Sequence, residues 1–505
     1  MSSTKSSYAQ ILKSSSIIGG AQGVNYLIGM ARVKVIAVLL GPAGVGLIGL
    51  YQSATSFLGI LSGFGISFSG SREVAEVYGN DAGDLDRIAR TIKTLRRVCW
   101  VTGMLGWLLT IAFAKPLSIW VFGTDEHAKA IAILGGSLLL SDVSGGQTAL
   151  LQGMRRIGDL ARINVATGLI GTVVAIALYA WLGERGIVPA LLSSAGVGLL
   201  CSWWFVRKVP VAAIKLPWLE TWKQARRLLG LGLAFMWSAL LTTIVALMIR
   251  AMIVRVCGLE ANGIYQAVWG LSGMFAGFVL GAMGADFFPR LTAVAQDGEK
   301  ANHLINEQTE IGMLLALPGL LATLCFAPWV MRIFYSAKFL SGAELIPWIV
   351  FGVFGKVVSW PLGYLLMAKG ESKWFAATET SFGLGHLALS VLLIHFTGLR
   401  GVAVAFAILY TLYTIYLLGV ARRLTWFRWS PDVHKLLFLS GLLLACGAFV
   451  VKFVPQGWAE GLGFLLTLVA GLLCLRGIVV RLGSEHRIVG AMRKIPGFEL
   501  LCKIN

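Results

Sequence analysis

The sequence predicts an all-α polytopic membrane protein with about 14 transmembrane helices. Composition, the length of the apolar runs and the placement of the cations support this prediction. Of the 505 residues, 57% are hydrophobic and 13% are charged, and the mean hydropathy is +0.78. A soluble fold cannot cover so much apolar surface, whereas a bilayer requires spans of about 20 apolar residues.

Each apolar run approaches the length that a helix needs to cross a bilayer. The predicted spans cover about residues 11–39, 45–70, 98–121, 128–151, 161–182, 187–206, 230–256, 263–289, 311–334, 343–367, 375–396, 402–421, 435–454 and 460–480. None of them shows the ten-residue alternation of a membrane barrel strand. Helices satisfy every backbone group within the segment, so they are predicted here.

The cations indicate the orientation of these spans. Most of the lysines and arginines fall in the two tails and in the loops that follow even-numbered spans. The other side of the membrane holds only a few, namely Lys115, Lys129, Arg185, Lys338, Arg400 and Lys452. Both termini are therefore predicted to be cytoplasmic. The net charge of +19 is explained by this distribution and does not imply nucleic-acid binding.

An internal repeat is visible in the loops. A shift of 215 positions places Gly183-Glu184-Arg185-Gly186 on Gly398-Leu399-Arg400-Gly401, and a shift of 217 places Gly41 on Gly258. Each copy contains six predicted helices, so both copies face the same way in the membrane. We therefore expect two six-helix bundles related by a pseudo-twofold axis along the membrane normal.

The chain is predicted to divide into four parts. These are an N-terminal six-helix bundle over 1–206, a cytoplasmic amphipathic linker over 207–229, a C-terminal six-helix bundle over 230–425, and two extra transmembrane helices with a basic cytoplasmic tail over 426–505. The linker has two prolines, two tryptophans and several cations, which is typical of a segment at the membrane surface. An ordinary surface loop is the alternative.

Charged residues inside the spans are the candidate functional residues, since they are costly in a bilayer and usually face an interior or a water-filled cavity. Cations predominate among the residues concerned, which are Arg32, Lys34, Arg250 and Lys356, with the carboxylates Asp142 and Glu379. Arg32 and Arg250 lie within one residue of equivalent repeat positions, as do Asp142 and Lys356. This pattern predicts a roughly symmetric basic cavity. Its ligand would carry phosphate or carboxylate, because guanidinium binds phosphate oxygens in a bidentate manner.

Structural alternatives exist for the same residues. Arg32 and Lys34 could extend outward from the end of a long first helix. Lys356 and Asp142 could pair with each other, and Glu379 could be a proton site or the partner of a cytoplasmic-side lysine. Asp142 and Glu379 are therefore kept as possible coupling or gating residues.

No enzyme motif accompanies these charges. The seven cysteines are scattered, without Cys-x-x-Cys or a His/Cys cluster at ligand spacing. The sequence contains no G-x-S-x-G motif, Walker loop or His/Glu metal pattern. We expect a transporter without a cofactor or metal, and not an enzyme.

One stretch supports a family assignment. The sequence from Leu39 to Gln52, Leu-Leu-Gly-Pro-Ala-Gly-Val-Gly-Leu-Ile-Gly-Leu-Tyr-Gln, followed by Ser71-Arg72-Glu73, resembles the opening of Wzx-type O-antigen translocases. These are polysaccharide transporters of the MOP flippase superfamily, which also contains the MATE exporters and the MurJ lipid II flippases. The resemblance covers about residues 8–425.

The resemblance implies a flippase in the bacterial inner membrane. It would move an undecaprenyl-diphosphate-linked oligosaccharide from the cytoplasmic to the periplasmic leaflet by alternating access, with membrane lipids and polysaccharide polymerase machinery as partners. Two alternatives remain open. The last two helices match the helix number of MurJ and keep a lipid II-type substrate possible, and a MATE-like multidrug or cation antiporter would require a cavity rich in carboxylates.

Overall fold

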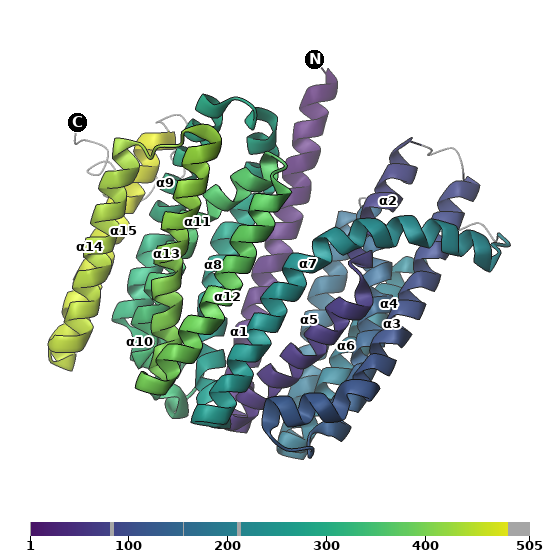
Figure 1. The fold of residues 1–505 in the computed structure, drawn as a ribbon, viewed down its shortest axis with the longest axis horizontal. Coiled ribbons are helices and arrows are strands. Elements are labelled where there is room, and N and C mark those ends of the chain that lie inside the picture. The colour runs from purple at the N-terminus through teal and green to yellow at the C-terminus, as the bar shows by residue number, and fades with distance from the viewer. Residues whose placement is uncertain (1, 81–84, 155, 210–213, 483–505) are drawn as a thin grey trace. The chain divides into compact units, whose positions relative to one another are not determined.

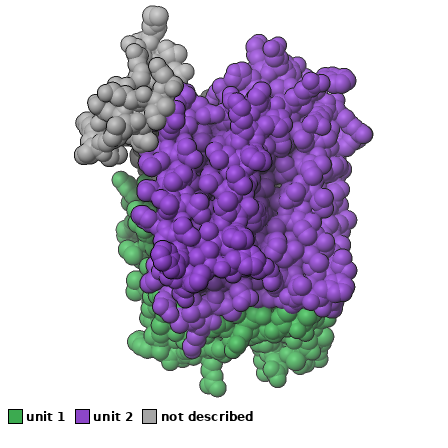
Figure 2. All heavy atoms as spheres, turned by 90° about the vertical axis from the view of Figure 1, so that its left-hand side faces the viewer, with its two compact units in different colours: residues 1–264, 334–336 green, residues 265–333, 337–505 purple. Residues whose placement is uncertain are grey.

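The computed structural model describes residues 2–80, 85–154, 156–209 and 214–482, and all regular secondary structure in this part of the chain is helical (Figure 1). The basic tail predicted after the last helix lies outside the described residues from 483 onward. The helices form two compact units (Figure 2). Unit 1 contains Met1–Ile264 and Phe334–Ser336, and unit 2 contains Tyr265–Ile333 and Ala337–Asn505.

Unit 1 consists of seven α-helices, one short 3-10 helix and the start of an eighth α-helix. They are α1 (Ser2–Gly63), α2 (Ile66–Asn80), α3 (Leu85–Phe122), α4 (Ala128–Gly153), α5 (Ile157–Leu182), η1 (Gly183–Gly186), α6 (Ile187–Val206), α7 (Trp218–Cys257) and the beginning of α8 (Leu259–Val294). One hydrophobic core of this unit joins side chains of α1, α3, α4, α5, α6 and α7, including Leu50, Val121, Ile131, Tyr179 and Leu247.

Unit 2 contains the rest of α8 and the helices that follow. They are α9 (Gly298–Cys325), α10 (Ala327–Phe334), η2 (Ala337–Glu344), α11 (Ile346–Ala368), α12 (Ser372–Thr397), α13 (Leu399–Thr425), α14 (Pro431–Phe453) and α15 (Gln456–Leu482). The last two helices pack against each other and against α9.

Eleven helical ranges in the described part of the chain are long and apolar enough to cross a membrane. The range Ile157–Val206 contains two of the predicted spans, and Gly20–Gly63 overlaps two more. The predicted span 263–289 lies within α8 (Leu259–Val294). The all-helical, multi-pass class is confirmed, and the count of 14 remains a prediction.

The first two predicted spans are joined by a kink within one helix and not by a loop. The loop predicted at Gly41 is a kink inside α1, where Gly41 has φ 65° and ψ −169° and Pro42 follows. The kink packs on the turn between α7 and α8, since Asn262 Nδ2 donates to the Gly46 carbonyl at 3.0 Å. A side chain at Gly263 would collide with the Pro42 carbonyl. The stretch that carries the family resemblance therefore contributes a close helix contact.

Two span boundaries differ from prediction. The span expected over 45–70 breaks between α1 and α2, where Phe64 and Gly65 have φ of 45° and 65°. The span expected to start at 311 belongs to a longer helix, because the Asp297 side chain caps α9 by accepting from the Lys300 amide at 3.1 Å. Hydropathy alone does not detect the polar first turns of such a helix.

The predicted repeat appears in the backbone. Gly183, after α5, has φ 57° and ψ −134°, and Gly398, after α12, has φ 59° and ψ −142°. Three residues later in each copy, a side chain at Gly186 would collide with the Leu178 carbonyl, and one at Gly401 with the Leu393 carbonyl. Both loops thus use one glycine for a left-handed conformation and another for a close backbone approach.

The linker is anchored on unit 1. Lys93 donates to the Ile214 carbonyl at 2.7 Å, and Arg97 donates to the Leu216 carbonyl at 2.8 Å and to Thr221 at 2.7 Å. The linker passes directly into α7, which packs on α1 and α3 within unit 1. The sequence placed the span 230–256 in the C-terminal bundle, so the units divide the chain later than the predicted boundaries. Residues 210–213 of the linker are not among those described.

Candidate functional site

Two of the predicted cations lie on contacting helices of unit 1. Arg250 is on α7 and is only 9% exposed. Its neighbours Leu247 and Ala251 are buried in the same core as Leu40 of α1 and Tyr179 of α5. The helices that carry Arg32 and Arg250, α1 and α7, pack on each other.

Arg32 is half-buried on α1 and interacts electrostatically with the Tyr179 hydroxyl of α5. That hydroxyl is buried and has no hydrogen-bond partner of ordinary geometry. An arginine beside a buried hydroxyl provides donors and an acceptor together, which suits a polar ligand. Lys34 is also half-buried. It is two residues from Arg32 and therefore points to another side of the helix.

Asp142 occupies a different place in unit 1. It lines a cavity of about 300 Å³ at the break between α1 and α2, together with Gly65, Thr102 of α3 and Met236 of α7. The Thr102 side chain interacts with the carboxylate. The Oδ2 atom is buried without a hydrogen-bond partner. Asp142 is therefore a carboxylate with unused acceptor capacity beside an irregular backbone segment.

Lys356 and Glu379 come together in unit 2. They lie on α11 and α12 and interact electrostatically with each other. The Tyr413 hydroxyl of α13 donates to Glu379 Oε1 at 3.2 Å. The structure thus brings Lys356 close enough to Glu379 for their charges to interact, and the pairing of Glu379 with a cytoplasmic-side lysine stays a prediction.

An aromatic cluster adjoins this pair. Phe382 lies with its ring centroid 4.8 Å from that of Tyr410 and 4.7 Å from that of Tyr413. Phe406 is 4.8 Å from Tyr410 and 5.8 Å from the ring of His386. The two tyrosines were not among the residues predicted from the sequence. Their spacing, three residues apart on α13, would have placed both on one helix face.

Among the described residues, no group of three or more His, Cys, Asp or Glu side chains could hold a metal ion. Unit 1 carries cations on α1 and α7 and a separate carboxylate on α4, whereas in unit 2 Lys356 interacts with the carboxylate of Glu379. Such an arrangement can bind an anion through Arg32 and Arg250. It contains no pairing of nucleophile and base that would carry out bond-breaking chemistry.

Comparison with known proteins identifies relatives that match most of this chain. The family model described as polysaccharide biosynthesis protein matches residues 11–295. A curated relative, the lipid III flippase of Escherichia coli (strain K12), is 24% identical over 417 residues, which cover 79% of this chain and 94% of the relative.

Solved structures share the fold. The lipid II flippase MurJ in an inward closed conformation has a TM-score of 0.65 at 14% identity, covering 90% of this chain and 97% of MurJ. An inward-facing multidrug resistance MATE family transporter of the MOP superfamily has a TM-score of 0.62 at 17% identity, covering 82% of this chain and 96% of the transporter. The chain therefore has a fold of the MurJ and MATE type.

Proposed function

Because this chain belongs to the polysaccharide biosynthesis protein family, we propose that it is a flippase for an undecaprenyl-diphosphate-linked oligosaccharide. The substrate would be an O-antigen or other surface polysaccharide repeat unit, moved from the cytoplasmic to the periplasmic leaflet of the inner membrane. The observation that carries the proposal is the presence of Arg32 and Arg250 on the contacting helices α1 and α7. The lipid III flippase relative supports the same class of substrate.

The sign of the interior charge favours this substrate over a cationic drug. Cations within membrane spans are costly and are retained where an anion or a carboxylate balances them. In this proposal Arg32 and Arg250 hold the diphosphate, Lys34 adds positive charge from another side of α1, and Lys356 binds the substrate when its interaction with Glu379 is broken. A MATE-like antiporter of cations would instead need carboxylates at these positions.

Transport in this proposal requires no bond to be made or broken. The two units alternate access to the substrate while the polyprenyl chain stays in lipid. A diphosphate moving outward down an inside-negative potential gains roughly 2.3 kcal/mol per charge per 100 mV. Asp142 and Glu379 would couple or gate the movement through their protonation or through a bound cation.

The experiment is complementation of a flippase-null strain. Arg32→Ala and Arg250→Ala should abolish glycan export at normal membrane abundance, because losing a charge-assisted phosphate contact weakens binding about ten- to a hundredfold. Arg32→Lys and Arg250→Lys should retain part of the activity, since lysine keeps the charge without the planar fork. Arg90→Ala, which removes an exposed cation of α3, is the matched control. Normal export by the Arg32/Arg250/Lys356 triple alanine variant would contradict the proposal.

A lipid II-type substrate is the second candidate, favoured by the two helices α14 and α15 that pack on α9. The same variants should then be tested in cells depleted of their lipid II flippase. If the wild-type chain rescues those cells but does not rescue glycan export, the substrate is a lipid II-type molecule and not a surface polysaccharide repeat unit.

The coupling role of Asp142 has a separate test. Asp142→Asn should leave membrane abundance unchanged, because Oδ2 has no partner to lose. If the carboxylate couples transport to an ion, substrate accumulation in proteoliposomes should stop responding to an imposed ion gradient, while substrate binding persists. A response equal to that of the wild type would remove Asp142 from the mechanism.

A further inference from the structure

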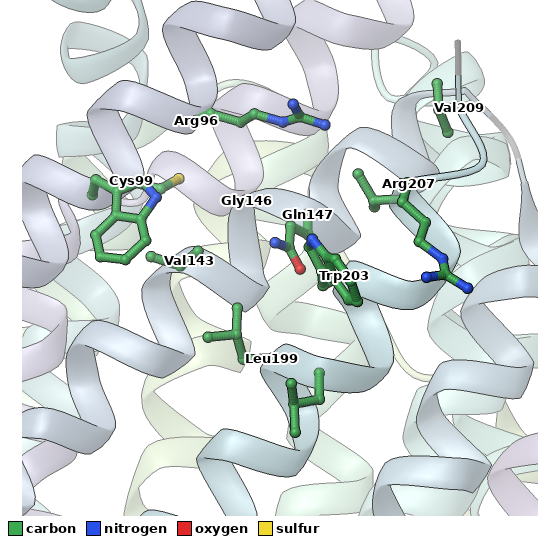
Figure 3. A pocket seen from close by; sticks show the side chains of 12 residues that line it. Arg96, Cys99, Val143, Gly146, Gln147, Leu199, Trp203, Arg207 and Val209 are labelled. Atoms are coloured by element: carbon green, nitrogen blue, oxygen red, sulfur yellow. The ribbon is translucent and has the colours of Figure 1, made fainter. Parts of the chain in front are cut away.

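Unit 1 contains a second recess, between α3, α4 and α6, that none of the candidate site residues lines (Figure 3). Its volume is about 580 Å³, within the range of ligand pockets. Its rim is exposed, since Trp100, Leu200 and Trp203 are 51%, 65% and 50% accessible. The recess lies at the linker end of α6, on the side predicted to be cytoplasmic.

The recess carries positive charge without compensation. Arg96 and Arg207 line it, and its lining contains no carboxylate. Arg96 has no hydrogen-bond or ion-pair partner within the described ranges. The next residue, Arg97, is fully engaged with the linker through Leu216 and Thr221. Of two adjacent arginines, one therefore anchors the structure and the other is left available to a ligand.

Arg207 is held at the rim by aromatic side chains. Its guanidinium lies 3.4 Å from the ring centroid of Trp204 and 5.3 Å from that of Trp203. Figure 3 shows Arg96 above Gln147 and Trp203, and Arg207 to their right. Arg207 thus adds charge at the edge, while Arg96 is positioned to bind directly.

Gln147 supplies a directed donor. Ser202 donates to Gln147 Oε1 at 2.6 Å and shares a hydrogen bond of 3.0 Å with Ser144. Because the carbonyl end of the amide is engaged by α6, the amide nitrogen is the end that remains to donate. An anion in the recess would therefore meet a guanidinium and an amide N–H₂.

The remaining walls are apolar. Val143, Leu199 and Leu200 line the recess beside the indoles of Trp100 and Trp203. Tryptophan is enriched at the membrane interface, where one side of the indole contacts chains and the other contacts headgroups. A free phosphate would leave these walls uncovered, whereas a lipid covers them with its acyl chain.

We propose that this recess binds an anionic phospholipid of the leaflet next to the linker. The phosphodiester is held by Arg96 and the Gln147 amide, Arg207 adds charge at the rim, and an acyl chain lies against Trp100 and Leu200. The site is separate from the proposed transport function, and its failure would leave that function untouched.

Native mass spectrometry of the purified full-length protein tests the proposal. Wild-type protein should retain phosphatidylglycerol and should not retain phosphatidylcholine of the same acyl chains. Arg96→Gln should weaken retention about tenfold, and Arg96→Gln with Arg207→Gln by about ten- to a hundredfold. Arg90→Gln makes the same charge change on the same helix outside the recess and should retain the lipid fully.

Three results would overturn the assignment. Equal retention by the double variant and the Arg90→Gln control would show that the lipid binds elsewhere. Equal retention of phosphatidylcholine would show that the charge of the recess does not select its occupant. Displacement of phosphatidylglycerol by undecaprenyl diphosphate, with loss of both lipids in the double variant, would make the recess a site for the polyprenyl substrate.

Discussion

The two repeat copies share backbone geometry but differ in their interior charges. Gly183 and Gly398 have closely similar backbone angles, and both following loops require a second glycine. At nearly equivalent positions farther inside, Asp142 of unit 1 has an unpartnered oxygen beside a helix break, and Lys356 of unit 2 faces Glu379. The two loops therefore have the same backbone geometry, while the charged side chains at nearly equivalent positions differ.

The largest expected effect tests the shared backbone. Gly186→Ala and Gly401→Ala should both lower stability by about 1–3 kcal/mol or more, because the new Cβ meets a backbone carbonyl that cannot move aside easily. Gly196→Ala and Gly419→Ala are the controls, since a Cβ there meets nothing within 4 Å. Thermal unfolding followed by size-exclusion chromatography measures all four. A loss in only one copy would show that the two loops are not equivalent.

A smaller effect tests the divergence of the charges. Lys356→Met should destabilise unit 2 because Glu379 loses its counter-charge, and Lys356→Met with Glu379→Gln should recover most of the loss. The coupling measured by this double-mutant cycle should be about 0.5–3 kcal/mol. Asp142→Asn combined with Lys356→Met should show additive effects. Strong coupling between Asp142 and Lys356 would support the pairing of these two residues. It would also weaken the proposed difference in interior charge between the two units.

The fold was largely predictable because its main determinants are local. The apolar runs and the repeated glycines at Gly183 and Gly398 suffice to predict an all-helical membrane protein with duplicated halves. The kink at Gly41 was predicted as a loop, since the continuation of α1 depends on close packing against the α7–α8 turn. The break at Phe64–Gly65 was not predicted, as apolar residues continue through it.

The candidate site was less predictable because it depends on tertiary neighbours. Charges inside spans identify Lys356 and Glu379 separately, but their interaction requires α11 and α12 to present them to each other. The same holds for Arg96 and Arg97. Adjacent arginines look alike in the sequence, and only the position of the linker engages one and leaves the other available.

The smallest expected effect concerns a contact that unit 2 does not repeat. His127 precedes α4, its Nδ1 lies 2.8 Å from the Tyr51 hydroxyl, and its ring stacks on Phe122 with centroids 4.0 Å apart. The residue 215 positions later is Gly342, which has no ring to make these contacts. Burial lowers the pKa of His127 below its ordinary value of 6.5, and nearby Glu126 opposes this more weakly.

The sign of the pH dependence follows from that lowered pKa. As the pH falls below about 6.5, the unfolded chain binds a proton at His127 more readily than the folded chain, so the folded state loses stability through this residue. His127→Gln keeps a hydrogen-bonding side chain that does not titrate, and the variant should lose less stability than the wild type between pH 7.5 and pH 5. The difference should be no more than about 2 °C in Tm, since the ring is only half-buried. Parallel pH profiles of stability for the two proteins would mean that His127 has the same pKa in the folded and the unfolded state. The contact with Tyr51 would then give unit 1 no pH dependence that unit 2 lacks.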